Sequence, residues 1–140
     1  MENQHLAQEI FGPTTVVVGY QDRKQLLALA EQLEGHLTAT IQADESELAE
    51  YSDLVEILSR KVGRVILNAF PTGVEVCHAM VHGGPYPATS DSRTTSVGSL
   101  AIDRFLRPVC YQDVAEALLP PELKNDPSLG LRRLVNGSYE

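Results

Sequence analysis

Hydrophobic and polar positions follow one another along the chain in blocks that predict strands separated by helices. Residues 14–18, Thr-Thr-Val-Val-Val, are β-branched throughout, which is typical of a strand that is buried on both faces. Residues 23–33 have helical spacing, with Asp22 as the expected N-cap and Gly35 just beyond the end of the helix. A second short strand is predicted at residues 37–41.

The strongest helical pattern covers residues 45–61. Asp44 and Glu47 have the spacing of a capping box. Apolar side chains recur on one helical face at Leu48, Tyr51, Leu54, Val55 and Leu58. Gly63 is expected to end the helix, and a third strand follows at residues 64–68. Strands that alternate with helices of this length predict an α/β fold with a parallel βαβαβ sheet and helical crossovers.

The periodicity stops between residues 70 and 95, where prolines and glycines interrupt any regular element. A loop of this length in a compact chain is usually functional or disordered, and its apolar residues argue against disorder. Helical spacing returns at residues 95–106, Pro108 ends it, and residues 109–112 have the pattern of a short strand. Residues 113–140 are expected to form an irregular tail.

The composition is that of an ordinary soluble globular protein. Nineteen acidic and 11 basic residues give a formal net charge of −8, and an acidic balance repels phosphate backbones, so nucleic acid is not an expected partner. The apolar runs are too short to cross a bilayer and the N-terminus has no basic region, so no membrane association is expected. Two cysteines are too few for a disulfide framework. These features predict a reduced, cytoplasmic protein.

Two short motifs carry the candidate chemistry. Residues 9–13, Glu-Ile-Phe-Gly-Pro, directly precede the first predicted strand, and one interpretation is a simple turn. In the other, Glu9 and Phe11 lie at a strand edge, where a carboxylate accepts hydrogen bonds from ribose hydroxyls and a phenyl ring packs on a flat heterocycle. The second motif, Gly-Arg-Val-Ile-Leu-Asn at residues 63–68, is followed by a loop that ends in His-Gly-Gly at 82–84. Its simplest interpretation is a buried strand with paired glycines that close the loop.

In this order and at this separation, the two motifs resemble the C-terminal part of the aldehyde dehydrogenase superfamily. Further segments are similar to its NADP-dependent α-ketoglutarate-semialdehyde branch: FPTGVEVCHAM at 70–80, GGPYPATSDSRTTSVG at 83–98 and RFLRPVCYQ at 104–112. The resemblance covers nearly the whole chain but only the last part of a family member. It implies a partial catalytic domain at residues 1–105, then an oligomerisation strand and an irregular tail at residues 106–140.

The resemblance also assigns roles to individual residues. The motif glutamate of the family binds the nicotinamide-side ribose and the motif phenylalanine packs beside the nicotinamide, roles that would fall to Glu9 and Phe11. The loop at residues 70–82 lines the aldehyde tunnel in relatives. Its side chains expected to face the substrate are Phe70, Cys77, Met80 and His82. Residues 106–112 would join the oligomerisation sheet of a homo-oligomer.

The sequence departs from the common pattern of the superfamily around the paired glycines. That pattern has Pro-Phe before them and Ser-Gly-x-Gly after them, whereas this chain has Val81-His82 before and Pro-Tyr-Pro-Ala at 85–88 after. The departure fits the semialdehyde branch and leaves the detailed mapping of the tunnel open. A dicarboxylate semialdehyde requires a cationic anchor, and Arg93 is the arginine of the loop placed to provide one.

The chemistry implied by the resemblance also requires a thiolate nucleophile, a glutamate base and a dinucleotide-binding domain. The family's nucleophile precedes the Glu-x-Phe-Gly-Pro motif, and only eight residues precede Glu9 here. We therefore expect no catalytic residue, no activity and no tight cofactor binding in this chain alone. Cys77 and His78 are adjacent in sequence, and adjacent side chains rarely converge as a nucleophile and its base, so a packed or tunnel-lining thiol is favoured for Cys77.

A metal site is not expected, although Cys77, His78 and His82 could be suggested as ligands. Histidines four residues apart bind metal when they lie on a helix with a third ligand nearby, and this segment runs into Gly-Gly-Pro instead.

Two functions remain open. The first is a segment of an NAD(P)-dependent enzyme that oxidises an aldehyde such as α-ketoglutarate semialdehyde to its acid. The second is a non-catalytic truncated relative that acts as a self-association or subunit-interaction module. A third, weaker alternative is a small-molecule-binding domain that uses the loop.

The expected parallel sheet leads to a prediction about association. Parallel strands normally have both faces covered, and an uncovered edge invites pairing with another chain. We therefore expect the purified chain to self-associate as its concentration rises, with a sedimentation coefficient that increases accordingly. A single monomeric species at high concentration in sedimentation velocity would contradict this prediction.

Overall fold

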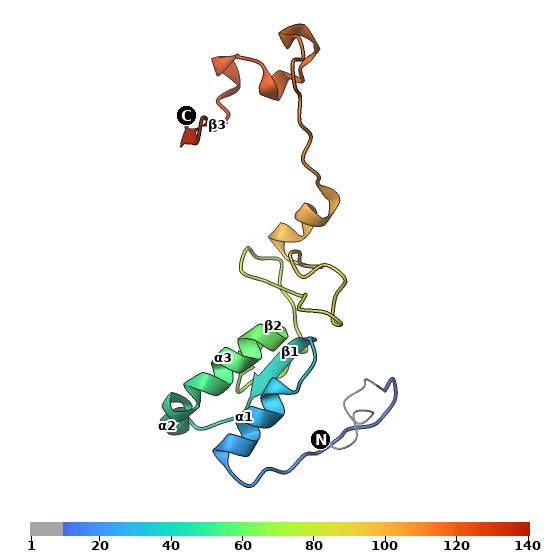
Figure 1. Cartoon of the computed structure of the whole chain (residues 1–140), viewed down its shortest axis with the longest axis vertical. Helices are drawn as coiled ribbons and strands as arrows, with labels where there is room; N and C mark the ends of the chain where they lie inside the picture. The colour runs from blue at the N-terminus through green and yellow to red at the C-terminus, as the bar shows by residue number, and fades with distance from the viewer. Residues whose placement is uncertain (1–9) are drawn as a thin grey trace. The chain divides into compact units, whose positions relative to one another are not determined.

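The computed structural model describes residues 10–140 of the chain. They form two compact units, which divide between Leu106 and Arg107. Figure 1 shows the succession of elements along the chain. The first unit carries the candidate site and contains all the longer helices and strands among the described residues.

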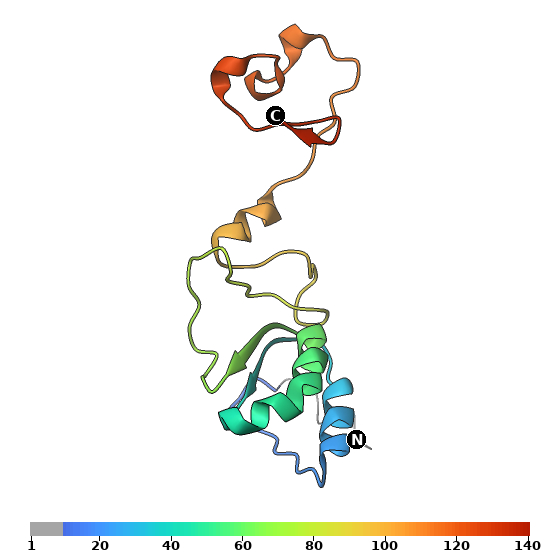
Figure 2. The ribbon, with the colours of Figure 1, turned by 90° about the vertical axis from the view of Figure 1, so that its left-hand side faces the viewer.

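The first unit is built on a two-stranded parallel sheet. Up to residue 67 its regular elements are α1 (Arg23–Glu31), β1 (His36–Ile41), α2 (Glu45–Leu48), a 3-10 turn (Ala49–Tyr51), α3 (Ser52–Lys61) and β2 (Val62–Leu67). The strands pair in register from His36 opposite Val62 to Ile41 opposite Leu67. Helices α1 and α3 pack against each other on the same side of both strands (Figure 2). The fold is therefore a mixed helix and strand arrangement with one helical crossover, from β1 through α3 to β2, and the predicted parallel pairing of these two strands is confirmed.

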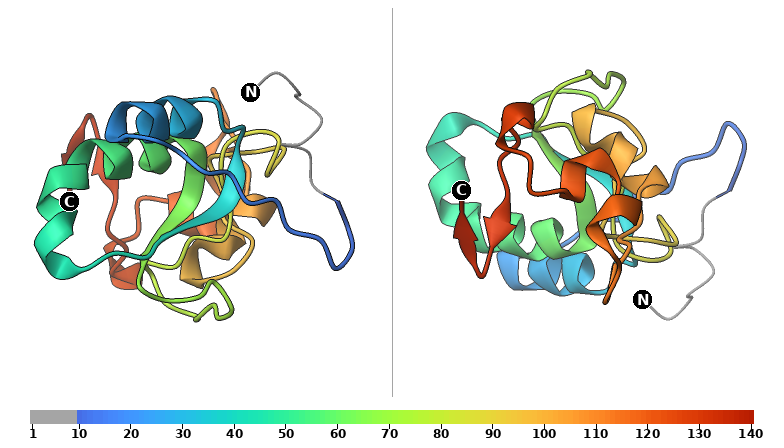
Figure 3. Two further views of the ribbon diagram at one scale, coloured as in Figure 1. Left: turned by 90° about the horizontal axis from the view of Figure 1, so that it is seen from below. Right: turned by 90° about the horizontal axis from the view of Figure 1, so that it is seen from above.

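The hydrophobic core of this unit lies between α1, α3 and the sheet. Ala30, Leu54, Ile57 and Leu58 form its buried cluster, with Tyr51 among the half-buried side chains packed around them. The views from below and from above show the two helices side by side over the strands (Figure 3). The helical spacing of apolar residues thus directs one face of α3 onto α1 and the sheet, as predicted, except that Val55 is 40 % exposed and Ile57, which was not predicted, is buried.

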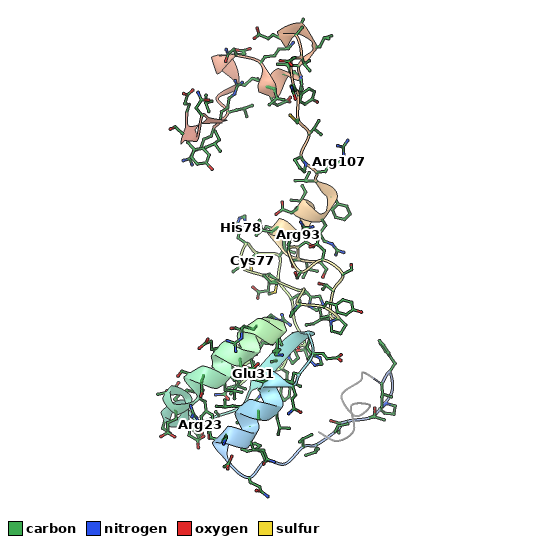
Figure 4. The ribbon with its side chains drawn as sticks, in the orientation of Figure 1. Arg23, Glu31, Cys77, His78, Arg93 and Arg107 are labelled. Carbon is green, nitrogen blue, oxygen red and sulfur yellow. The ribbon has the colours of Figure 1, made fainter. Side chains whose placement is uncertain are left out.

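Two ion pairs join α1 and α3 near both ends of α1. Arg23 lies 2.5 Å from Asp53, and Arg60 lies 2.8 Å from Glu31. Figure 4 shows Arg23 and Glu31 at opposite ends of α1. Because all four side chains are well exposed to solvent, these pairs orient the helices more than they stabilise the fold.

The helix boundaries differ in part from those expected. The Asp22 carboxylate accepts a hydrogen bond from the Gln25 amide at 2.8 Å, so the predicted N-cap of α1 is confirmed. Asp44 makes no side-chain capping bond, and the expected capping box with Glu47 is wrong. The single helix expected at 45–61 is interrupted by the 3-10 turn, and Gly63 lies inside β2 rather than at the end of α3.

Two predicted strands are not formed. Residues 14–18 are extended but have no ladder partner among the described residues, and Val17 is 89 % exposed. Residues 109–112 are also irregular and exposed, and so is the whole stretch 106–112 that was expected to provide an oligomerisation strand. A strand exists only when a neighbour accepts and donates its hydrogen bonds. The observed sheet is therefore smaller than the expected βαβαβ sheet.

The helix predicted at residues 95–106 is a 3-10 helix, Ser99–Phe105. The second unit contains short 3-10 turns at Glu116–Leu118, Pro121–Leu123 and Pro127–Leu129, and a hairpin of β3 (Leu134–Val135) and β4 (Ser138–Tyr139). The expected irregular tail thus has local order at its end. No helix among residues 10–140 is both long enough and apolar enough to cross a membrane.

Glycines allow the loop that follows β2 to lie directly against the start of the sheet. A Cβ on Gly63 would overlap the carbonyl of Gly83, and a Cβ on Gly84 would lie 2.5 Å from the carbonyl oxygen of His36. A Cβ on Gly35 would overlap the carbonyls of Pro85 and Tyr86. The role of Gly35 is therefore this close approach rather than the expected helix cap.

We predict that Gly63→Ala destabilises the chain, since its methyl group must displace the backbone at Gly83. Overpacking of this kind costs about 1–3 kcal/mol of unfolding free energy, measurable by urea denaturation. Gly73→Ala is the matched control, because a Cβ added at Gly73 would meet no atom of the described residues within 4 Å. Equal stability of the two variants would show that the loop does not rest on the sheet at Gly63.

Candidate functional site

The candidate site is the loop that leaves the carboxyl end of β2 and returns to the start of the sheet. We call residues 70–82 the substrate loop, following the role that the resemblance implies. Asn68 fixes its starting point: the Asn68 side chain accepts a hydrogen bond from the Ala43 amide at 2.9 Å and donates one to the Ala43 carbonyl at 2.8 Å. Asn68 has φ 49°, a left-handed conformation that asparagine tolerates better than most residues. The loop therefore begins from a turn that is tied to the end of β1.

The far end of the substrate loop is fixed at His82. The His82 amide donates to the Thr95 hydroxyl at 2.8 Å, and the His82 carbonyl accepts from the Ser96 amide at 3.0 Å. Thr95 is only 6 % exposed, and its hydroxyl donates to the Val97 carbonyl at 2.7 Å. Because both backbone groups of His82 are bonded to residues 95 and 96, the end of the loop has a defined position.

The middle of the substrate loop is held through the carbonyl of Cys77. This carbonyl accepts from the Ser99 amide at 3.1 Å and from the Met80 amide at 3.4 Å. Gly98, at φ 91°, lies so close that a Cβ on it would be 3.0 Å from the Cys77 carbonyl oxygen. Figure 4 shows Cys77 and His78 on this part of the loop.

The structure brings together only some of the side chains proposed from the sequence. Glu9 lies outside the described residues. Phe11 is 94 % and Phe70 79 % exposed, whereas Cys77, Met80 and His82 are half-buried in the loop. Cys77 and Met80 lie close together, as the hydrogen bond between their backbones requires.

His82 faces a different space from Phe70, Cys77 and Met80. It lines a cavity of about 380 Å³, of which those three side chains are not part. The other lining residues are Leu37, Ala88, Thr89, Ser90, Asp91, Thr94, Ser96 and Arg104. Nδ1 of His82 is buried and has no hydrogen-bond partner in the part of the chain that the structure describes. The described residues therefore do not by themselves enclose a tunnel lined by Phe70, Cys77, Met80 and His82 together.

No group of three metal-ligating side chains is assembled within residues 10–140. The Cys77 thiol makes no hydrogen bond with His78 in this part of the chain, and both cysteines there are free. Cys77 is thus half-buried, and its thiol has no hydrogen-bonded base among the described residues.

Arg93, the expected carboxylate anchor, is engaged by its own loop. Its Nε and Nη2 donate to the two oxygens of Asp91 at 2.9 and 3.0 Å, and its amide donates to the same carboxylate at 3.0 Å. The side-chain and backbone hydrogen bonds from Arg93 lower the pKa of Asp91 from 3.8 to about 2. A substrate carboxylate would therefore have to compete with Asp91 for Arg93.

Sequence reasoning missed Arg64 and Thr95. Arg64 donates to the carbonyls of Pro71 and Gly73, and buried Thr95 holds His82. An arginine within an apolar strand is a signal that was available in the sequence. Nothing in the local pattern distinguishes Thr95 from the hydroxyl residues around it.

Nearly the whole chain matches two proteins of known class. No protein-family model matches the sequence. The chain is 58 % identical over 135 residues, 96 % of its length, to the α-ketoglutaric semialdehyde dehydrogenase of Acinetobacter baylyi. It is 49 % identical over 134 residues, again 96 % of its length, to α-ketoglutaric semialdehyde dehydrogenase 2 of Azospirillum brasilense. The chain spans about a quarter (26 %) of the length of each.

These matches confirm the resemblance drawn from the two motifs. Over nearly all of its length the chain is related to the aldehyde dehydrogenases. Within that class, the relatives it matches are α-ketoglutaric semialdehyde dehydrogenases, the branch indicated by the segments at 70–80 and 83–98.

We predict that the Asp91 pKa depends on Arg93. In the wild-type chain the Asp91 carboxyl should titrate near pH 2, and in Arg93→Met its pKa should rise towards 3.8 because the two side-chain hydrogen bonds that favour the carboxylate are lost while the backbone bond remains. Any stabilisation from the pair is thus present above the ordinary aspartate pKa and is lost as the pH falls through about 2. Carbon-13 NMR titration of the Asp91 carboxyl group in both proteins measures the two values. An unchanged Asp91 pKa in Arg93→Met would contradict the pairing.

Proposed function

We propose that this chain provides the substrate loop and one edge of the cofactor site of an NADP-dependent aldehyde dehydrogenase. The proposed parent reaction is oxidation of α-ketoglutaric semialdehyde to its carboxylic acid. The 58 % identity over 96 % of the chain carries this proposal, and the tethering of the substrate loop at Asn68 and His82 supports it.

The residues at the proposed cofactor edge suit an aromatic heterocycle. The ring of Phe11 is almost completely exposed, so its apolar face is free to pack against a flat ring such as nicotinamide. NADP would supply the oxidant by accepting a hydride from the aldehyde carbon. Glu9 is proposed to bind the adjoining ribose, a role that rests on the resemblance.

The contribution proposed for the loop is to bind and orient the aldehyde. Cys77 and Met80 offer soft, apolar surface, and Phe70 offers an exposed ring at the start of the loop. A nucleophilic role is not proposed for Cys77, since no base is hydrogen-bonded to its thiol among the described residues. The nucleophile, the general base and the dinucleotide-binding domain would come from outside this chain, and the chain alone would be inactive.

The proposed parent fold is the aldehyde dehydrogenase catalytic domain, with residues 14–18 as an additional strand. The last of these residues, Val18, lines a groove of about 460 Å³ together with Thr40 and Ile41, at the carboxyl end of β1. Val18 thus shares this groove with the carboxyl end of β1, the end at which a parallel strand at residues 14–18 would finish. Exposed Phe105 and Leu106 favour a homo-oligomer in which residues 106–112 form a strand, and the free cysteines fit a cytoplasmic protein.

A second candidate function is a non-catalytic module that associates with intact subunits. The apolar groove between α1, α3 and the end of β1 favours it, because Leu26, Leu29 and Leu48 line that groove. The two functions differ in one respect: only the first requires the substrate loop to act in turnover.

A chimeric enzyme tests the first function. The matching region of the Acinetobacter baylyi enzyme is replaced by this chain, and NADPH formation is followed with α-ketoglutaric semialdehyde. We expect turnover by the chimera, none by the isolated chain, and turnover retained in Cys77→Ala because Cys77 is not the nucleophile.

The unmodified Acinetobacter baylyi enzyme is the positive control. A folded chimera of normal oligomeric state without turnover would contradict the proposed function and favour the module. Abolition of turnover by Cys77→Ala, with NADP binding intact, would overturn the assignment of the nucleophile to another part of the enzyme.

A further inference from the structure

We infer that Arg64 is the positioning residue of the substrate loop, so that its guanidinium sets where Cys77 and Met80 present themselves to the aldehyde. This inference rests on the proposed function. Arg64 lies in β2, where it pairs in register with Thr38 of β1, and it is half-buried. Its backbone is thus fixed by the sheet while its side chain reaches over the loop.

The guanidinium of Arg64 donates hydrogen bonds from two nitrogen atoms to the first turn of the substrate loop. Nη1 donates to the Gly73 carbonyl at 2.6 Å, and Nη2 donates to the Pro71 carbonyl at 3.2 Å. These carbonyls are two residues apart and meet two donors of one planar group. An arginine fork has the geometry to hold both acceptors at once, whereas a lysine ammonium is a point charge on a flexible stem.

The same guanidinium also contacts the far part of the loop. Nη1 lies 3.6 Å from the sulfur of Met80. One side chain therefore connects residues 71–73 with residue 80, across the segment that contains Cys77. Because the Met80 amide bonds to the Cys77 carbonyl, a displacement of Met80 is transmitted to Cys77.

Arg64 differs from the arginines that form ion pairs, because its guanidinium donates to backbone carbonyls and not to a carboxylate. Arg23, Arg60 and Arg93 each lie within 3.0 Å of a carboxylate oxygen. Arg64 has no carboxylate partner within residues 10–140, and the contacts of its guanidinium described above are all with the substrate loop. Its positive charge is therefore directed to backbone carbonyls, which are strong acceptors for a charged donor.

The consequence concerns substrate binding more than turnover. We call the contacts of Arg64 with Pro71, Gly73 and Met80 the Arg64 clamp. Its loss would let the substrate loop move by a fraction of an ångström to an ångström. Such a movement changes the fit of the loop to the aldehyde but not the cofactor contact proposed for Phe11. Misplacement on this scale can cost up to about a hundredfold in efficiency. A clamp of this kind would therefore appear in the KM for the semialdehyde and in the selectivity among aldehydes of different length.

Three variants test the inference: Arg64→Met, Arg64→Lys and Arg60→Met as a matched control. Arg60 lies on α3 and forms exposed ion pairs with Glu31 and Glu56, so its replacement removes an arginine without touching the loop. In the 140-residue chain, hydrogen–deuterium exchange of residues 71–82 is measured for each variant. In the chimeric enzyme, KM for the semialdehyde, KM for NADP and kcat are measured separately.

We expect faster exchange at residues 71–82 in Arg64→Met, a smaller increase in Arg64→Lys, and none in Arg60→Met. We also expect Arg64→Met to raise the KM for the semialdehyde by about tenfold or more while KM for NADP stays unchanged, with partial rescue in Arg64→Lys. Unchanged hydrogen–deuterium exchange of residues 71–82 in Arg64→Met would show that Arg64 does not hold the loop, whatever kinetic constants the chimera has. Faster exchange with unchanged KM in an active chimera would overturn its role in substrate positioning. A chimera without turnover would count against the proposed function only, because the exchange result on the chain is independent of it.

Discussion

The close approach of two backbone segments is the constraint on which the candidate site depends. Gly63 and Gly84 allow the returning loop to lie against the start of both strands, where any side chain at these positions would overlap a carbonyl or press against it. This contact closes a long loop whose two ends would otherwise be separated by the length of β2. With Asn68 at one end and His82 at the other, the sheet defines where the substrate loop starts and returns. The position of the site is thus set by backbone packing, and side-chain chemistry acts at that position.

Features of the fold that depend on neighbouring residues could be predicted from the sequence. The Asp22 cap, most of the apolar face of α3 and the parallel pairing of the strands around residues 37–41 and 64–67 were found as expected, because each follows from local pattern and short crossover length. Residues 14–18 and 109–112 have strand composition but no partner strand among the described residues. The composition of a segment indicates whether its side chains suit a buried strand. Strand formation also requires a neighbouring strand to hydrogen-bond with, and composition does not reveal that neighbour.

The candidate site was predictable in location but not in detail. The two motifs and the loop between them indicated the right family and the right region. The contacts that fix the loop were not visible, since Arg64 meets carbonyls nine and seven residues away and Thr95 meets an amide thirteen residues away. In an irregular segment no period relates such positions, so a side chain's acceptor depends on the path of the backbone. The same reason explains why Arg93, expected to be free for substrate, is paired with Asp91.

The small core between α1 and α3 bears on the lifetime of the polypeptide. Among the described residues only five hydrophobic side chains are buried, and valines, leucines and aromatic residues remain exposed along both units. Net stability is a small difference between large terms even for domains with full cores. A chain with so few buried side chains spends more of its time in open forms that proteases cleave and chaperones retain. In the isolated chain, resistance to proteolysis would therefore depend on how much of this apolar surface a partner covers.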